Sequence, residues 1–528
     1  MKRPDVLIIG SGPLGATFAR FLVAKGQRVT MIDAGAYLSK RPGEHLQNAF
    51  IFQQQPNLFS DVAAANLQNA SIPAGSDFID NLDWQAYDPQ RLDPKTRLNF
   101  QNPDQSGRTN MSAAAITYAV GGMATHWGCT TPTPGPIERT PLISDADWEA
   151  ILPIANRLLN VHTDAFTPCF LNTVLQQELN AAGYAVENLP QAVEKRGVNT
   201  ELAHLVTWTG VDTILGPLAD DPEAYRDKFE ILAEHRAVEL VRKGNRIESV
   251  KVQNLANGTI THLEADTIVV ACGSLLTPQL LWKSGIRPDA LGRFLCENVV
   301  AACTVVINDA IVQRLRDFKD NPARNESIPI AWNEPPPELG WSATAARPTH
   351  TQIRRAGRLS AFNQAIADVR LSIQFLYFSM VEVNRDNRIT FSDTVTDRFG
   401  MPQLTFDYRV GDEDAKQAHA MMEDMTRMAQ LIGGFIPNAS GLPAFQSPGS
   451  SLHFMGTCRM GDDAKQDETT SVCDTYGRVW GIDNLYLGSV GMIPNKMADN
   501  PTLTACAIAV RSLSKLLGCS IQDLGKLV

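Results

Sequence analysis

The chain has 528 residues, of which 44% are hydrophobic and 20% are charged, and its formal net charge is −10. This length exceeds what one hydrophobic core usually serves, so we expect two joined domains, and the ordinary composition excludes intrinsic disorder as the main state. The acidic balance lacks the basic face with which a protein displaces counterions from phosphates, so we expect no nucleic-acid partner.

Cysteines and histidines are scattered and form no metal-binding pattern. The nine cysteines contain no CxxC pair, and the nine histidines form no cluster with metal-ligand spacing, so we expect no metal site. Free thiols are typical of a reducing compartment, which predicts a cytoplasmic location. The apolar run at residues 6–9 is too short for a secretory signal, and no stretch approaches the roughly 20 apolar residues of a membrane span, so we expect no membrane partner.

The first 35 residues predict a strand, a turn, a helix and a second strand. Residues 5–9 are an apolar run typical of a buried strand, and residues 28–33 form another. Between them, residues 14–25 carry apolar side chains at helical spacing, and Gly26 follows where a helix C-terminus favours glycine. We interpret this segment as one strand–turn–helix–strand unit.

Three glycines in the turn of this unit form a GxGxxG pattern. Gly10 allows the tight turn, Gly12 lets a pyrophosphate approach the backbone, and Gly15 lets the helix pack closely on the strand. Asp33 ends the next strand, where a carboxylate can bind a ribose hydroxyl. The pattern predicts a dinucleotide site, and NAD, NADP and FAD all fit it.

Two later segments favour FAD among these cofactors. Residues 267–272 predict a strand that leads through Gly273 into a helix, and residues 481–489 predict another approach of this kind near the C-terminus. The Asn500-Pro501 pair then opens the last helix. An extended FAD contacts the ends of strands from distant parts of a sequence, whereas a nicotinamide site is usually completed within one Rossmann half.

The region after residue 305 has a different character. The Pro-rich stretch at residues 334–337 is a candidate linker, residues 371–378 alternate like a sheet strand, and residues 381–390 predict a hairpin through an Asn-rich turn. Met421 and the apolar residues that follow it recur at helical spacing up to Gly433. We interpret this methionine stripe as core packing, because methionine fills irregular gaps.

Four segments together resemble the glucose–methanol–choline flavoprotein family, and within it the pyranose-oxidase branch. They lie at residues 10–15, 120–127, 391–407 and 453–501, and so are distributed over the whole chain. The resemblance implies an α/β fold with two domains. We expect a discontinuous, Rossmann-like FAD-binding domain (residues 1–165, 200–305 and 445–528) and a smaller substrate-binding domain in which a sheet is backed by helices (residues 306–444).

The implied activity is FAD-dependent oxidation of a secondary hydroxyl of a pyranose sugar or glycoside to a keto-sugar. Oxygen, giving hydrogen peroxide, or a quinone-like acceptor would then reoxidise the flavin. Oxidation of another alcohol stays open as an alternative. A non-catalytic flavin-binding protein is disfavoured, because such a protein has no need of a base. The sugar, the ring carbon and the oligomeric state stay open.

Two residues of the C-terminal motif are the expected catalytic pair. Oxidation of an alcohol requires a base for the hydroxyl proton, and a neutral imidazole such as that of His453 suits this role near neutral pH. An amide such as that of Asn500 can orient the same oxygen without titrating. In the resembled family these motif positions carry out those two roles.

The Thr125-His126-Trp127 element implies how the flavin is held. In the resembled family its histidine can bond covalently to the flavin 8α-methyl group, which makes the flavin a stronger oxidant. The oxidase pattern continues with a threonine near flavin N5, but this chain has Gly128, which favours an acceptor other than oxygen. We expect the cofactor to contact Gly10, Gly12, Gly15, Asp33, Thr125, His126, Gly273, Ser489 and Pro501.

The substrate segment departs from the family pattern as well. Gln352 and the Ile-Arg-Arg355 that follows it resemble the start of the sugar-binding loop, and Gln352 is the expected ligand of a sugar hydroxyl. The acidic and aromatic residues expected next are replaced at residues 356–360, so the preferred sugar cannot be transferred from the family, and a bulkier glycoside is conceivable.

Overall fold

The computed structural model of the chain describes residues 3–54, 56–74, 101–166, 168–195, 205–332, 338–356, 368–397, 399–437 and 441–528. The candidate linker at 334–337 and most of the substrate segment at 356–360 lie outside these ranges. Across the described ranges, no helix combines the length and the apolar character needed to span a membrane.

The N-terminal strand–helix–strand unit is confirmed. Strand β1 (Val6–Ile9) leads into helix α1 (Pro13–Ala24), which is followed by strand β2 (Val29–Ile32). Gly26 has φ +87°, so it ends the helix in a backbone conformation that glycine adopts without strain. β1 pairs in parallel with β2 on one side and with β14 (Thr267–Val270) on the other.

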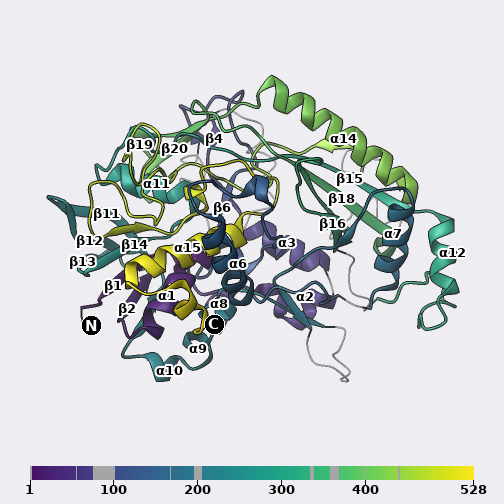
Figure 1. Cartoon of the computed structure of the whole chain (residues 1–528), viewed down its shortest axis with the longest axis horizontal. Coiled ribbons are helices and arrows are strands. Elements are labelled where there is room, and N and C mark those ends of the chain that lie inside the picture. Colours follow the sequence, from purple (N-terminus) through teal and green to yellow (C-terminus); the bar gives the residue numbers. More distant parts are fainter. Residues whose placement is uncertain are drawn as a thin grey trace.

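A five-stranded sheet in the order β10-β2-β1-β14-β23 contains this unit. Its outer strands are β10 (Phe229–Leu232) and β23 (Leu485–Leu487), and every pairing is parallel. The sheet therefore joins segments from three distant parts of the chain. The C-terminal helix α15 (Thr502–Leu517) lies against α1 beside this sheet (Figure 1).

A seven-stranded sheet forms the other half of the molecule, in the order β21-β15-β18-β17-β16-β7 with β22 also paired to β15. Its strands are β7 (Glu187–Asn188), β15 (Val299–Ile307), β16 (Glu338–Trp341), β17 (Thr349–Arg355), β18 (Ser372–Ser379), β21 (Gly433–Phe435) and β22 (Ala444–Phe445). Helix α14 (Asp412–Ile432) crosses one face of it, beside α7 (Phe170–Ala181) (Figure 1).

Alternation along β17 and β18 gives this sheet two different faces. Ile353 and Phe375 are buried in the cluster that contains Met421 and Met425 of α14, so the methionine stripe is core packing, as predicted. The neighbouring residues of the same strands point to the opposite face, which lines the cavity described below.

The predicted hairpin at residues 381–390 is wrong. β18 pairs with β15 and β17, whereas β19 (Arg388–Thr396) pairs with β20 (Pro402–Asp407). The Asn-rich stretch does make a turn, in which Asn387 exchanges hydrogen bonds of 3.0 and 2.9 Å with the backbone of Arg409. The turn therefore connects two sheets instead of two paired strands.

The remaining elements include a three-stranded sheet in the order β11-β12-β13 and are otherwise mostly short. They are η1 (Leu46–Asn48), α2 (Phe50–Gln54), α3 (Pro56–Asn66), β3 (Gln68–Asn69), β4 (Ile72–Pro73), β5 (Gln101–Asn102), β6 (Ala115–Ile116), η2 (Gly122–Thr125), η3 (Pro136–Glu138), α6 (Asp145–Leu158), β8 (Val193–Lys195), β9 (Val206–Trp208), α8 (Val211–Leu215), α9 (Pro217–Asp220), α10 (Pro222–Tyr225), β11 (His235–Lys243), β12 (Arg246–Asn254), β13 (Ile260–Leu263), α11 (Gly273–Lys283), α12 (Asp309–Asp317), η4 (Val369–Leu371), η5 (Val490–Met492) and α16 (Ile521–Gly525).

Candidate active site

The glycine loop after β1 is built for close backbone approach. Gly10 has φ +101°, and a Cβ atom there would lie 2.4 Å from the backbone oxygen of Ala271. A Cβ atom on Gly15 would lie 2.1 Å from the backbone oxygen of Gly10, so this glycine lets α1 pack on the strand end. Gly12 has no atom within 4 Å of such a Cβ position, which leaves open space at the start of α1 for a phosphate.

Asp33 follows β2 and is held beside this loop. Its carboxylate accepts hydrogen bonds from the Ser11 backbone (2.9 Å), the Ser11 hydroxyl (2.6 Å) and the Gly35 backbone (2.7 Å), and burial raises its pKa. The Ser11 hydroxyl oxygen also accepts from the backbone N–H of Gly121 (2.9 Å). Ser11 thus joins the glycine loop to the segment that carries the Thr-His-Trp element.

A cavity of about 690 Å³ runs from this loop to the seven-stranded sheet. Of the predicted site residues, Gly10, Gly12, Asp33, His126, Gly273, Gln352, His453, Asn500 and Pro501 line it. Gly15, Thr125 and Ser489 lie below its surface; the Thr125 hydroxyl donates to the Gly122 carbonyl (2.8 Å), and the Ser489 hydroxyl accepts from the Gly491 N–H (3.0 Å). The volume is within the range of organic-cofactor sites, and the open cradle at Gly12 fits the diphosphate of FAD.

His126 and Gly128 both line the cavity. His126 Nε2 lies 2.9 Å from the Thr117 hydroxyl, and burial lowers the pKa of His126 to about 4, so the ring is neutral near neutral pH. A Cβ atom on Gly128 would lie 3.9 Å from Nη1 of Arg354, with no closer neighbour. Arg354 donates from Nε to the side-chain oxygen of Gln374 (3.2 Å), which holds its guanidinium at this position.

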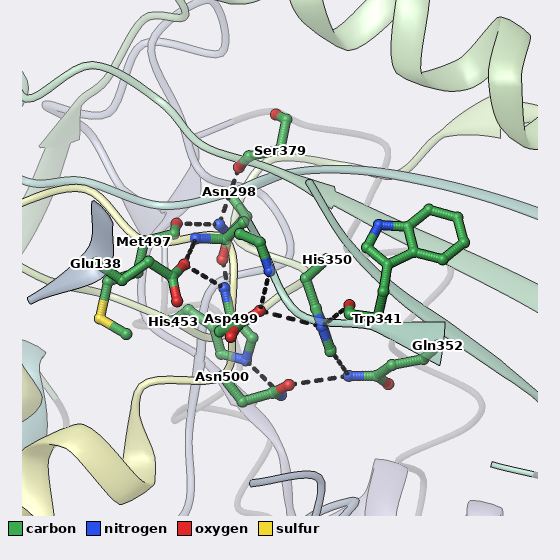
Figure 2. A network of polar contacts seen from close by, with 12 residues as sticks. Glu138, Asn298, Trp341, His350, Gln352, Ser379, His453, Met497, Asp499 and Asn500 are labelled. Carbon is green, nitrogen blue, oxygen red and sulfur yellow. Dashed lines mark hydrogen bonds and ion pairs between the residues drawn. The ribbon is translucent and has the colours of Figure 1, made fainter. Parts of the chain in front are cut away.

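His453 and Asn500 are adjacent at the far end of the cavity, with His453 Nε2 and Asn500 Nδ2 3.0 Å apart (Figure 2). On its other side, His453 Nδ1 lies 2.8 Å from Oδ1 of Asn298. Both N–H groups of the Asn298 amide are used by the carbonyls of Ser379 (2.9 Å) and Met497 (2.7 Å), so its Oδ1 must accept and His453 Nδ1 carries the hydrogen.

The state of His453 follows from this arrangement. Burial lowers its pKa to about 3, so the ring is neutral and Nε2 has a free lone pair. Asn500 Nδ2 therefore donates toward Nε2, which leaves Asn500 Oδ1 to accept from Gln352 Nε2 at 3.0 Å. The site presents an unprotonated nitrogen to the cavity.

The chain of contacts continues through His350, which the sequence did not single out. Gln352 Nε2 lies 3.2 Å from His350 Nε2, and His350 Nδ1 lies 2.9 Å from the Trp341 carbonyl. Because Gln352 is the donor in the first contact, His350 carries its hydrogen on Nδ1. The amide oxygen of Gln352 takes no part in this chain of contacts and is the group through which this side chain can accept a hydrogen bond from a ligand.

Sequence reasoning missed Ser11, Asn298, His350 and Asp499. Ser11 and Asp499 are direct neighbours of predicted residues, so adjacency was a usable signal. His350 is two residues from Gln352 on the same strand, so the two share a face of the sheet. Asn298 precedes β15, and no local pattern relates it to His453. Within the described ranges, no three His, Cys, Asp or Glu side chains are grouped to hold a metal ion.

The cavity combines a glycine loop of the dinucleotide-binding type with a neutral imidazole. This combination is typical of a cofactor-dependent oxidoreductase. Models of the GMC oxidoreductases match residues 138–300 and residues 383–509, and the chain belongs to this family of FAD-binding flavoproteins. The FAD-binding fold and the oxidoreductase class predicted from the sequence are confirmed.

Two similar proteins align with nearly the whole chain. A pyranose 2-oxidase from Emericella nidulans is 33% identical, with 97% of this chain and 92% of that protein aligned. A C-glycoside 3-oxidase from Arthrobacter globiformis is 31% identical, with 97% and 94% aligned. The crystal structure of pyridoxine 4-oxidase from Mesorbium loti matches with a TM-score of 0.66 over 98% of this chain and 99% of that one; at 15% identity it supports the fold alone.

Proposed function

We propose that the protein oxidises a secondary ring hydroxyl of a pyranose sugar or glycoside to a ketone, with FAD as cofactor. The observation that carries the proposal is the unprotonated Nε2 of His453, which lies beside the Asn500 amide at the end of the cofactor cavity. The names of the two relatives support the substrate class, because carbons 2 and 3 of a pyranose ring bear secondary hydroxyls.

Three side chains have separate roles in this proposal. His453 Nε2 takes the hydroxyl proton, the Asn500 amide fixes the same oxygen, and the free amide oxygen of Gln352 accepts a hydrogen bond from a neighbouring hydroxyl. When bound, FAD supplies the two-electron acceptor for the carbon–hydrogen bond that breaks. Burial keeps His453 unprotonated at every pH above about 4, so the base is ready before substrate binds.

The cofactor would lie along the cavity with its diphosphate at Gly10 and Gly12 and a ribose hydroxyl at Asp33. We also propose a covalent bond between His126 and the flavin 8α-methyl group. After acid precipitation, the yellow colour then stays with the polypeptide, and His126→Ala releases FAD to the supernatant. Free FAD from the wild-type protein would rule out the bond without affecting the fold.

We propose oxygen or a quinone as the second substrate, and Gly128 favours the quinone. The resembled oxidases carry a hydroxyl at this position, and Gly128 supplies none. The neighbouring Arg354 contributes a positive charge but no hydroxyl.

We further propose the domain division given by the sequence: residues 1–165, 200–305 and 445–528 for FAD, and residues 306–444 for the substrate. All five strands of the parallel sheet come from the FAD segments. Strand β15 contains residues on both sides of the boundary at 305/306, so we propose that it links the two domains.

The test is a panel of free pyranoses and glycosides mixed anaerobically with the holoenzyme. A substrate bleaches the flavin absorbance, and NMR of the product identifies the ring carbon that became a ketone. His262→Ala, at an exposed position of β13, is the matched histidine control. Bleaching by simple primary alcohols but by no sugar would overturn the substrate class.

A further inference from the structure

Two carboxyl groups are buried next to the proposed catalytic pair. Glu138 ends the short helix η3 and is 0% exposed, and Asp499 directly precedes Asn500 and is 1% exposed. Asp499 lies between Glu138 and His350 (Figure 2). Buried carboxyl groups need a hydrogen-bond donor for each oxygen or a proton of their own.

Two of the four carboxyl oxygens are satisfied by the backbone. Glu138 Oε1 accepts from the N–H groups of Ala498 (2.7 Å) and Asp499 (3.0 Å), which are the two residues before Asn500. Asp499 Oδ1 accepts from the N–H of Ala343 (3.1 Å) and lies 3.2 Å from His350 Nδ1, the nitrogen that carries the hydrogen. Glu138 therefore contacts the backbone that leads into Asn500, and Asp499 contacts His350.

The other two oxygens are Glu138 Oε2 and Asp499 Oδ2. Both are buried and have no hydrogen-bond partner. The two residues are neighbours, because Glu138 Oε1 accepts from the backbone N–H of Asp499. Two ionised carboxyl groups only accept, so a hydrogen bond between them would require a shared proton. One shared proton would satisfy both atoms, whereas without a proton two buried negative charges are neighbours.

We propose that Glu138 and Asp499 share one proton and act as positioning residues that hold Asn500 and His350 for the oxidation. Glu138 fixes the backbone that leads into Asn500, and Asp499 fixes His350, which orients Gln352. Neither carboxyl group touches the substrate. This inference deepens the proposed function and depends on it for its kinetic test.

Burial and the negative charge of Asp499 raise the pKa of Glu138 to about 9. The titratable side chains near Glu138 and Asp499 are His350 on β17 and His453, which contacts Asn298. The neighbouring charged side chains are Lys496, which is paired with Glu382, and Arg139, which is paired with Glu149. The His453 pKa lies on the acid side, so His453 cannot produce an alkaline loss of activity. Loss of the shared proton can produce an alkaline loss of activity, because the two carboxylates then repel each other.

The kinetic test compares anaerobic flavin reduction by a saturating sugar at pH 7 and at pH 10. With a pKa of about 9, we expect the wild-type rate to fall about tenfold between these two values. In Glu138→Gln, the amide accepts at Oε1 and donates from Nε2 to Asp499 at every pH, so the ratio should stay within about twofold. Glu138→Ala removes the acceptor for both backbone N–H groups and should slow reduction at both pH values.

Asp499→Asn is the second variant, because an amide there can donate to an ionised Glu138 and still accept from His350. It should flatten the pH profile in the same way as Glu138→Gln. An unchanged alkaline fall in both neutral variants would overturn the proposal.

A spectroscopic measurement separates this proposal from the proposed function. Infrared difference spectra of the holoenzyme between neutral and alkaline pH should contain the C=O band of a buried protonated carboxyl group, which disappears in Glu138→Gln. This band does not depend on any substrate, so a protein that reduces no sugar but has the band refutes only the proposed function. Absence of the band from the wild-type protein refutes the shared proton.

Discussion

The two ends of the cavity are built from different parts of the polypeptide. The fingerprint end (Gly10, Gly12, Asp33) depends on backbone geometry, because a single Cβ atom on Gly10 would overlap the backbone of Ala271, which follows β14. The polar end (Asn298, His453, Asn500) depends on hydrogen bonds between side chains. Backbone carbonyls orient the Asn298 amide, which orients His453, which in turn orients Asn500. We therefore expect substitutions at the fingerprint end to act through steric overlap. Substitutions at the polar end should act through lost orientation or a changed protonation state.

The largest effect is expected from loss of the base at the polar end. His453→Ala should leave FAD bound and slow anaerobic flavin reduction about 10²–10⁴-fold, the usual contribution of a positioned base. Stopped-flow absorbance measures this rate with the best sugar of the panel. His262→Ala should match the wild-type rate, and a His453→Ala rate within tenfold of wild type would refute the assignment.

At the fingerprint end, Gly10 and Gly12, which flank Ser11, should respond differently to substitution. Gly10→Ala forces a φ of +101° on alanine and places Cβ 2.4 Å from the Ala271 backbone, so we expect about 3 kcal/mol of lost stability or more. Gly12→Ala meets no protein atom within 4 Å, so it should keep the stability of the apoprotein and weaken FAD binding. Both are made in a His126→Ala background, which allows FAD to be removed.

Thermal unfolding of the apoproteins and fluorescence titration with FAD measure the two effects separately. Equal losses of stability in both variants would contradict the view that Gly10 serves the fold and Gly12 serves the ligand.

The fingerprint end could be predicted from the sequence and the polar end only in part. Gly10 and Asp33 lie within one contiguous strand–helix–strand unit, where local pattern fixes both structure and spacing. The polar end combines side chains from distant segments, and only family motifs identified His453 and Asn500. No periodicity relates Asn298 or Glu138 to them, because their contacts arise from tertiary packing.

The wrong hairpin has a related cause. Turn residues at 384–387 correctly indicate a change of chain direction, but they do not determine which strands pair across it. β18 is paired on both sides before the turn, so β19 must find its partner in β20.

Gly128, which also lines the cavity, should set the choice of electron acceptor. We expect prereduced enzyme to be reoxidised about 10²-fold faster by benzoquinone than by oxygen at equal concentration, on the scale of losing one preorganised donor. A Cβ atom fits at this position, 3.9 Å from Arg354, so Gly128→Thr should raise the oxygen rate, with Gly128→Ala as the control without a hydroxyl. Comparable rates with both acceptors would show that the hydroxyl is dispensable.

The smallest effect is the pH dependence of stability, and the two ends should differ in its sign. His453 has a folded pKa of about 3 against an ordinary value of 6.5, so the unfolded chain binds more protons between these values and stability falls as pH falls below 6.5. At pH 5 this amounts to about 2 kcal/mol. Asp33 has a raised pKa, so the folded chain binds more protons and its contribution falls as pH rises above 3.8.

Urea unfolding of the holoenzyme at pH 5 and pH 7.5 tests this difference. His453→Gln should lose about 2 kcal/mol less than the wild-type protein on going to pH 5, because glutamine at this position takes up no proton in either state. Asp33→Asn should change the dependence in the opposite direction, since it removes a group whose ionisation favours the unfolded chain. His262→Gln is the surface control and should follow the wild-type protein. Both variants could instead shift the pH dependence of stability in the same direction. Such a shift would indicate a general loss of packing, and the protonation states assigned to the two ends would be wrong.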